Sequence, residues 1–396
     1  MVAFLVLKKY AAAGAIAVGA MLTANSQALA LEIAETMAAA RWNAQKEALP
    51  SSHISGCVPQ TITFASGSAW SLCVKTIPSF GLVISHASFR KTASSPFITV
   101  LFDGRWSSIF VVYQPGSPRF HDLQLGFSAA TLGPIACPST TSNPRVLLDG
   151  NTICREYRDT EIEWKVDFEG THRVRRGVEV VYTAVLNAAN YDYIQEWAFR
   201  EDGTITPRAG STGPTFFGPN DTVTHVHNFT WRLDFDLNGP GGDSVFYTRH
   251  LENLNVVPST ATDFSVLVTH ETGLDWVATE FNTIKIVDST LRNGNGHQTE
   301  YELIPNRSGT SRHTEAFTKH DFWVTRFHAG ESLFAEDLPS LVADGESTVN
   351  QNLVEWYTQS IHHDPHNQDE ANQSTPTIWT GFTLRPNSLF DGTPFF

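Results

Sequence analysis

The stretch HVHNFTWRLDFDLNG, residues 225–239, alternates polar and apolar side chains and then ends in a turn signal, Asn238-Gly239. Alternation with a period of two is typical of a β-strand that buries one face. Similar short runs rich in Val, Ile, Phe, Tyr, Thr and Trp recur along the chain between turn signals such as FDGR, LLDGN, REDG, RNGNG and VADGE. The sequence therefore predicts a mostly β protein, a large antiparallel β-sandwich.

The composition sets limits on what this sandwich does. The chain has 396 residues, of which 41% are hydrophobic, so a large core is available and disorder is excluded. The formal net charge of −14 and the lack of a basic run argue against a nucleic-acid partner. No phosphate-binding loop, nucleophile elbow or C-x-x-C motif indicates nucleotide, α/β-hydrolase or thioredoxin chemistry.

The N-terminus has the pattern of a secretory signal peptide. Lys8 and Lys9 precede an apolar run over residues 10–24, and Ala28-Leu29-Ala30 offers a cleavage site. The run is short for a membrane span, so the sequence predicts a signal peptide over residues 1–30 and a secreted protein, with a retained signal-anchor as the alternative. No later stretch could span a bilayer, so no membrane partner is expected. Residues 32–48 predict a short helix, rich in Ala, Glu and Gln.

An exported chain can form disulfides, and four cysteines are present. Three connectivities are open, of which two local pairs are the simplest. Glycosylation sequons, which suit a secretory route, begin at Asn220, Asn228, Asn306 and Asn372.

Histidines supply the strongest chemical signal. In a strand, His225 and His227 point to the same face, where two imidazoles suit copper or zinc. A solvated pair is the alternative. A third ligand would come from a distant segment such as the one carrying His362, His363 and His366, which could instead be a polar surface loop.

Acidic residues give two further candidates. Asp234 and Asp236 share one face of the strand and, with the carbonyl of Phe235, could bind a hard cation or could simply be solvated. Near Tyr113, the pair His121-Asp122 ends another strand-like run. A buried Asp122 would have a raised pKa and could act as a general base, or it could cap a turn.

The segment LNAANYDYIQEWAF, residues 186–199, predicts a further strand. Within it, Asn190 and Asp192 flank Tyr191, and Tyr193 is expected to be a packing residue.

In chain order these segments resemble the catalytic domain of copper-dependent primary amine oxidases, whose topaquinone cofactor forms from one of the chain's own tyrosines. NYDYIQEWAFREDGTI is similar to the family's N-Y-D/E motif, HVHNFTWRLDFDLNG to its H-x-H strand with L-D-x-D-x-D-G, and WYTQSIHH to the strand of its third copper histidine. GHQTEYELIP, FWVTRF, GFTLRPNSLF, GLVISHASF and SIFVVYQ look like framework strands. The similarity runs from about Trp70, so residues 70–396 are expected to be the catalytic domain and residues 31–69 an extension that replaces the family's small N-terminal domains.

The resemblance implies oxidative deamination of a primary amine by O2, giving an aldehyde, ammonia and hydrogen peroxide, in a homodimer with exchanged hairpin arms. It assigns Cu2+ to His225, His227 and His363, and topaquinone to Tyr191, where the amine binds as a Schiff base. Asp122 becomes the proton acceptor, with His121 as its competitor, Tyr113 a partner of the quinone oxygen, and Asn190 the residue that orients the ring. The remaining implied groups are a second site for Ca2+ or Mn2+ at Asp234, Phe235, Asp236 and Leu353, and a Cys137–Cys154 disulfide, with Cys57–Cys73 left as the simplest local pair.

Some positions depart from the family pattern. Asn187 replaces a threonine before the N-Y-D motif, and Asp122 follows Tyr113 at a shorter interval than usual. Asn238 and Asn352 stand where the family has Asp near its second metal. Two alternatives therefore stay open, namely a non-catalytic relative that binds copper without forming the quinone and an unrelated metal-dependent hydrolase on a β-sandwich.

Overall fold

A computed structural model describes residues 54–114, 116–217, 223–253, 260–306, 312–366 and 375–395. The predicted signal peptide, the predicted helix over residues 32–48, and the sequons at Asn220 and Asn372 lie outside this part of the chain. The structure separates into two units, and all the described strands belong to the second, which comprises residues 50–123 with 127–396. Among the described residues, no helix is both long and apolar enough to cross a membrane.

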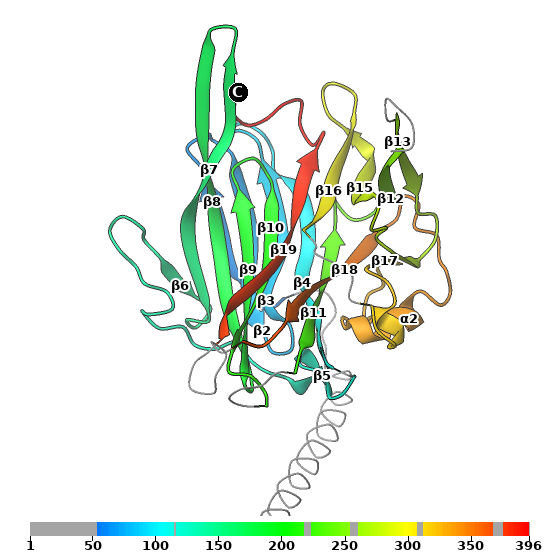
Figure 1. Cartoon of the computed structure of the whole chain (residues 1–396). Helices are drawn as coiled ribbons and strands as arrows, with labels where there is room; N and C mark the ends of the chain where they lie inside the picture. Colours follow the sequence, from blue (N-terminus) through cyan, green and yellow to red (C-terminus); the bar gives the residue numbers. More distant parts are fainter. Residues whose placement is uncertain are drawn as a thin grey trace, which may run out of the picture. The chain divides into compact units, whose positions relative to one another are not determined.

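Two large antiparallel sheets form the second unit (Figure 1). The nine-stranded sheet has the order β1 (Val58–Thr63), β2 (Ala69–Ile77), β3 (Gly81–Arg90), β4 (Ile98–Tyr113), β11 (His225–Phe235), β18 (Leu353–His363), β17 (Phe322–Arg326) and β14 (Thr272–Leu274), with β5 (Arg119–His121) paired to β4. The ten-stranded sheet has the order β13 (Thr260–Leu267), β12 (Asp243–Asn253), β15 (Phe281–Arg292), β16 (Gln298–Asn306), β19 (Thr375–Asn387), β10 (Ile205–Gly213), β9 (Tyr191–Arg200), β8 (Thr171–Ala188), β7 (Ile153–Phe168) and β6 (Val146–Leu148). The predicted mostly β fold is confirmed.

Helical structure is limited to single turns in the described part of the chain. These are η1 (Leu123–Leu125), η2 (Ala316–Thr318), η3 (Ala335–Asp337) and α2 (Leu338–Leu341).

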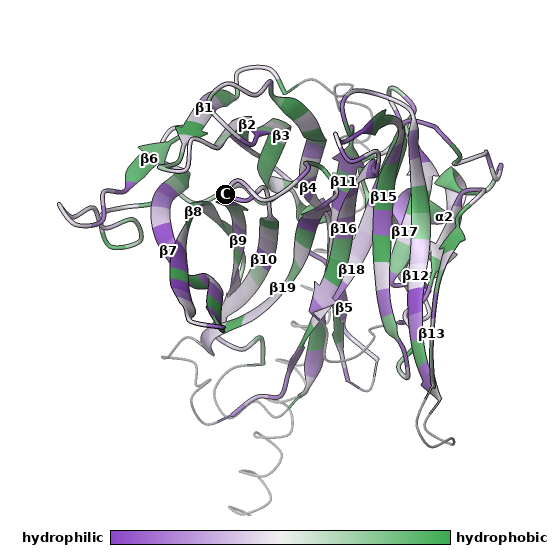
Figure 2. Ribbon diagram, turned by 90° about the horizontal axis from the view of Figure 1, so that it is seen from above, coloured by the Kyte–Doolittle hydropathy of each residue, from purple (hydrophilic) through white to green (hydrophobic). Residues whose placement is uncertain are grey.

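The core lies between the sheets because alternate side chains of their strands face one another. Trp231 of β11 meets Trp106 of β4 within its own sheet, with ring centroids 5.7 Å apart. It also meets Trp197 of β9 at 5.2 Å and Phe382 of β19 at 5.6 Å, both in the other sheet. All four side chains are fully buried. Figure 2 shows hydrophilic and hydrophobic residues alternating along strands such as β7.

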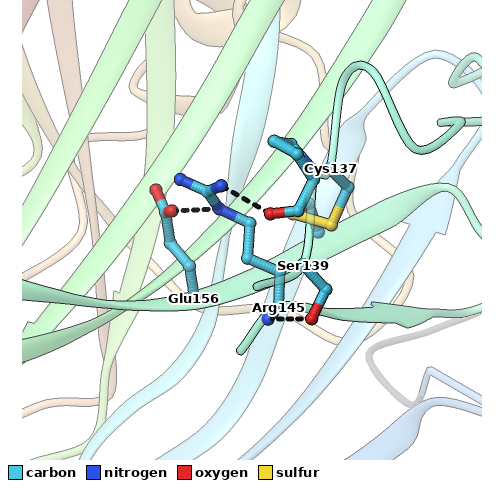
Figure 3. Close-up of a disulfide and its surroundings, with 6 residues drawn as sticks. Cys137, Ser139, Arg145 and Glu156 are labelled. Carbon is cyan, nitrogen blue, oxygen red and sulfur yellow. Dashed lines mark hydrogen bonds and ion pairs between the residues drawn. A yellow bond between two sulfur atoms is a disulfide. The ribbon is translucent and has the colours of Figure 1, made fainter. Parts of the chain in front are cut away.

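Both local disulfides are present in the structure. Cys57–Cys73 joins β2 to the residue before β1, and Cys137–Cys154 joins β7 to the segment before β6. Beside the second bridge, Arg145 pairs with Glu156 and donates to the Pro138 carbonyl at 2.6 Å, while its own backbone N–H donates to Ser139 Oγ at 3.0 Å (Figure 3). The segment that carries β6 is therefore fixed to β7 by covalent and polar contacts.

Candidate metal centre

Three histidines meet where β11 and β18 pair. His225 lies directly opposite His363 in the antiparallel register, and His227 follows two residues later on the same face. One ring nitrogen from each lies within 4.8 Å of the others, and each side chain is nearly or fully buried. His362 and His366 are exposed, so the structure brings together the three histidines that the resemblance selected.

Hydrogen bonds orient two of these rings. His225 Nδ1 lies 3.1 Å from the Val223 carbonyl, and His227 Nδ1 lies 3.0 Å from the Tyr193 hydroxyl. A carbonyl can only accept, so His225 carries its proton on Nδ1 and presents the Nε2 lone pair to the centre. His227 Nε2 is buried without a hydrogen-bond partner among the described residues.

Burial also keeps His227 neutral. Desolvation lowers its pKa well below the ordinary value, and the neighbouring His225 and His363 lower it further. A neutral imidazole is the form that binds a transition metal. The converging nitrogens, including the orphaned Nε2 of His227, fit a copper or zinc ion.

Tyr191 reaches this cluster from the opposite sheet. Its hydroxyl lies 2.8 Å from His225 Nε2 and 3.3 Å from His363 Nδ1. The prediction of one continuous strand over residues 186–199 is wrong, because β8 ends at Ala188 and β9 begins at Tyr191. Ala189 and Asn190 form a two-residue turn in which Ala189 has a φ of +62°. Tyr191 is therefore held by a tight hairpin rather than by a strand interior.

The polar neighbours of Tyr191 serve the hairpin. Asn190 Nδ2 donates to the Pro214 carbonyl at 3.0 Å, which ties the turn to the segment after β10. Asn187 Nδ2 donates to Asp192 Oδ1 at 3.0 Å across the β8–β9 ladder, and the side chain of Asn187 is exposed. Asn187, which departs from the family pattern, therefore makes a surface contact between the two strands.

Asp122 is connected to the histidine cluster through the hydroxyl of Tyr193. Tyr193 donates its hydroxyl proton to Asp122 Oδ2 at 2.6 Å, and the Tyr193 hydroxyl oxygen lies 3.0 Å from His227 Nδ1. Burial raises the pKa of Asp122 to about 6, while the Tyr193 hydrogen bond and the charge of His121 lower it. Tyr193 is more than the packing residue expected from the sequence. Its position two residues after Tyr191, on the same strand face, was the signal for this role.

His121, the competitor of Asp122, faces another part of the structure. Its ring packs 4.8 Å from Phe110 and 5.9 Å from Phe317, and its Nδ1 lies 3.2 Å from Glu336 Oε1. Phe110 and Phe317 belong to a separate cluster on the side of η3 and α2. Asp122 is the member of the pair that is linked to the histidines, by way of the Tyr193 hydroxyl.

Tyr113 covers one of the metal-binding candidates. It is the register partner of His225 across β4 and β11, and the two rings stack at 4.3 Å with an interplanar angle of 19°. Phe120 and Phe217 pack edge-on against Tyr113 at 5.9 and 5.4 Å. The histidine cluster therefore lies under an aromatic cover.

The predicted hard-cation residues lie at the other end of β11. Phe235 and Leu353 are cross-strand partners with fully buried side chains, so only their carbonyls could bind an ion. Asp234 is held by Arg232, whose Nη1 lies 3.2 Å from Oδ2. Burial raises the pKa of Asp236 to about 7. Asn352 directly precedes β18, and its Oδ1 is buried without a hydrogen-bond partner among the described residues.

Comparisons with known proteins show the family and the fold of this chain. The family model described as "Copper amine oxidase, enzyme domain" matches residues 65–396. Primary amine oxidase 1 of Arabidopsis thaliana is 25% identical over 82% of this chain and 61% of its own length, and histamine oxidase of Arthrobacter globiformis is 28% identical over 64% and 42%. The crystal structure of a copper-containing benzylamine oxidase from Hansenula polymorpha has a similar fold, with a TM-score of 0.67 and 18% identity over 85% of this chain and 62% of that one. The chain spans at most about three fifths of the length of these relatives.

Proposed function

The chain belongs to the copper amine oxidase enzyme-domain family, and from this premise we propose that it oxidises a primary amine with O2 to an aldehyde, ammonia and hydrogen peroxide. The observation that carries the proposal is the Tyr191 hydroxyl, which lies 2.8 Å from His225 in a buried group of three histidines. A tyrosine that is to become a quinone must lie against the metal, since no other group here would activate its ring.

The residues fit both groups that the family implies. His225, His227 and His363 would hold copper, and Tyr191 would be the precursor of topaquinone. Together these groups supply the two-electron oxidation of the amine and the return of those electrons to dioxygen. Tyr113 and its aromatic neighbours keep bulk water from the rings, which strengthens the electrostatic interactions inside.

Asp122 is proposed as the group that takes a proton from the substrate carbon. A base works best when its pKa lies near the working pH, and burial brings the pKa of Asp122 to about 6. Above that pH the carboxylate is ionised and ready to accept the proton. The Tyr193 hydroxyl stabilises the ionised form and fixes the direction of Oδ2.

The decisive experiment follows the tyrosine itself. The full chain, freed of metal and then incubated with Cu2+ in air, is expected to develop a visible quinone absorbance, and the Tyr191 peptide to gain two oxygens and lose two hydrogens. Tyr191→Phe is the matched control, which keeps the fold and the histidines but cannot be oxidised. Copper bound beside an unmodified Tyr191 would instead support the non-catalytic alternative.

The second part of the assay measures turnover. Amine-dependent release of hydrogen peroxide is expected only from protein that carries the quinone. A hydrolytic activity that persists in Tyr191→Phe would instead support the metal-dependent hydrolase.

We also propose a homodimer. The β7–β8 hairpin extends beyond its neighbouring strands (Figure 1), and several of its apolar side chains are exposed. Phe168 is 70% exposed, Val174 60% and Ile162 58%. Exposed apolar side chains on an extended hairpin suit a contact with a second copy of the chain.

Export is proposed from the predicted signal peptide over residues 1–30, and two disulfides in a chain of this size support an oxidising compartment. Mass spectrometry of the mature N-terminus tests the cleavage after Ala30. Of the sequons that the structure describes, Asn306 is exposed, whereas Asn228 is buried in β11 and donates to the Phe110 carbonyl at 2.9 Å. Glycan attachment is therefore expected at Asn306 and not at Asn228.

A further inference from the structure

The strand that leads into Asp122 is short and lies at an edge of its sheet. β5 has three residues and, among the described strands, pairs only with β4. Directly after it, the Asp122 N–H donates to the Ile109 carbonyl of β4 at 2.8 Å. Because so short a strand is held by few backbone hydrogen bonds, its side-chain contacts determine how firmly Asp122 is placed.

The side chains of this segment alternate between two faces. Phe120 packs against the core between the sheets, and Asp122 accepts the hydroxyl proton of Tyr193. Arg119 and His121 point to the other face, toward the segment that carries η2 and η3. The inner face of β5 therefore meets the candidate site, and the outer face meets a different part of the chain.

Arg119 is held by Glu315, the residue before η2. Its Nε and Nη2 donate to the two carboxylate oxygens of Glu315, both at 2.5 Å. Its guanidinium group also lies over the ring of Phe110 in β4, 5.5 Å from the centroid. A bidentate pair of this kind fixes the orientation of the arginine as well as its distance.

His121 is held by Glu336, which lies in η3. Glu336 Oε1 accepts a hydrogen bond from Ser108 Oγ of β4 at 2.7 Å, and the same oxygen is 3.2 Å from His121 Nδ1. Ser108 is 1% exposed and the Glu336 side chain 12%, so water competes little for these contacts. One carboxylate oxygen therefore joins β4 to β5.

The segment that supplies the two glutamates is itself fixed to the sheet. Phe317 of η2, Ala335 of η3 and Leu338 of α2 form one buried cluster with Phe110 and Val112 of β4. The carboxylates therefore reach β5 from a packed support on β4.

We propose that Glu315 and Glu336 are positioning residues for Asp122. By holding Arg119 and His121 on the outer face of β5, they fix the direction of the Asp122 carboxylate on the inner face. The proposal rests on the proposed function, in which Asp122 takes the proton from the substrate. Displacement of a reacting group by about 1 Å costs a rate about 100-fold, whereas a partly exposed ion pair adds little to stability. The two glutamates therefore matter more for the rate than for folding.

Reduction of the quinone by amine, under nitrogen, provides the first test. Glu315→Ala and Glu336→Ala are each expected to lower the limiting rate about 10-fold, and the double variant about 100-fold. The amine concentration at half-maximal rate, the copper content and the quinone content are expected to stay as in the parent protein. Glu336→Gln keeps an oxygen that can accept both hydrogen bonds, so it is expected to recover most of the rate.

Glu346→Ala is the matched control. Glu346 makes the same kinds of contact, lying 3.1 Å from Arg326 and 2.5 Å from His328, but neither partner belongs to β5. The control is expected to keep the limiting rate of the parent protein. An equal loss in Glu346→Ala, or no loss in the double variant, would overturn the proposal.

Hydrogen exchange of the copper-loaded full chain gives a readout that needs neither quinone nor substrate. In the double variant, the peptide that covers residues 119–122 is expected to exchange at least 10-fold faster, and in Glu346→Ala at the parent rate. Faster exchange with an unchanged rate of quinone reduction would show that the glutamates hold the strand without positioning the base, and the proposal would be wrong. If the parent protein forms no quinone, the proposed function fails, and exchange alone decides whether the glutamates place Asp122.

Discussion

At the scale of single residues, Tyr193 connects the proposed base, Asp122, with a proposed copper ligand, His227, which are far apart in the sequence. Its hydroxyl donates to Asp122 and lies 3.0 Å from His227 Nδ1. Since the Tyr193 proton is used for Asp122, His227 must donate from Nδ1, which leaves its Nε2 lone pair for a metal. One phenol therefore controls both the direction of the proposed base and the tautomer of a proposed copper ligand.

Tyr193→Phe tests this connection. The Tyr193 hydrogen bond lowers the pKa of Asp122, which burial otherwise raises to about 6. Without it the pKa rises, and since only the ionised carboxylate accepts a proton, the acidic limb of the kcat/KM profile is expected to move to higher pH. Copper affinity is expected to fall about 10-fold or more, because His227 loses the partner that orients it. The pH profile and a competitive copper titration measure the two effects.

Tyr182→Phe is the matched control for that variant. Tyr182 is fully buried, and its hydroxyl has no hydrogen-bond partner among the described residues. Removing it is expected to change neither the pH profile nor copper affinity. An identical shift in both variants would mean that loss of any buried phenol is sufficient.

Asp122→Asn separates formation of the cofactor from its use. The isosteric amide keeps the packing but cannot accept a proton, so turnover is expected to fall about 10²- to 10⁴-fold while quinone absorbance still develops. Stopped-flow reduction of the quinone by amine, under nitrogen, measures the proton-abstraction step directly. Full activity in Asp122→Asn would move the base to another residue.

At the scale of secondary structure elements, the β8–β9 hairpin determines where Tyr191 lies. Gly213, in β10, makes this hairpin possible. Its φ is +118°, and a Cβ on it would lie 2.3 Å from the Asn190 carbonyl oxygen and 3.0 Å from Tyr191 Cα. A side chain at this position would displace the backbone that carries the phenol.

Gly213→Ala is therefore expected to slow or abolish quinone formation while the protein still folds, as shown by unchanged far-UV circular dichroism. Gly296→Ala is the control. Gly296 also has a positive φ, +82°, but a Cβ there would meet no atom within 4 Å. If both variants slow the quinone equally, backbone strain rather than the contact with Asn190 is the cause.

The β7–β8 hairpin carries the prediction about assembly. Phe168→Ser with Val174→Ser removes two of its most exposed apolar side chains and is expected to shift the protein from dimer to monomer in analytical ultracentrifugation. Val266→Ser on β13 is the control, because Val266 is 49% exposed on a strand at the opposite edge of the same sheet. A monomeric parent protein would contradict the proposed dimer.

The alternation of polar and apolar residues within single strands explains which parts of the site could be predicted from the sequence. The period of two along residues 225–235 predicted both the strand and the shared face of His225 and His227. His363 could be chosen over His362 only through the family resemblance, because adjacent residues in a strand give no sign of which face is buried. The two-residue turn at Ala189-Asn190 was missed because Ala189, which takes the positive φ, is not a turn former, and Asn190 is not followed by glycine.

At the scale of the whole molecule, the fold class followed from composition and alternation, whereas the strand order did not. β11 pairs with β4 and β18, which are far from it in the chain, and no local signal encodes such pairings. The meeting of Asp122, Tyr193 and His227 depends on that order, so it became visible only in the folded structure.

The two disulfides should contribute to the stability of the whole fold. They close loops with sequence separations of 16 and 17 residues. Loops of that length correspond to about 3 kcal/mol each through restriction of the unfolded chain. Replacing either pair by serine is expected to lower the free energy of unfolding by about 2–4 kcal/mol, measured by urea denaturation. An unchanged urea midpoint in both variants would mean that the core alone sets the stability.

The candidate metal centre is divided between two sheets, and this has a consequence for when the cofactor could form during folding. The histidines belong to one sheet and Tyr191 to the other, so the proposed quinone could form only when both sheets are in place. The oxidation proposed for Tyr191 would therefore follow closure of the sandwich, and a misfolded chain would stay colourless even with copper present. The quinone absorbance per milligram of protein would then measure the fraction of molecules that completed folding.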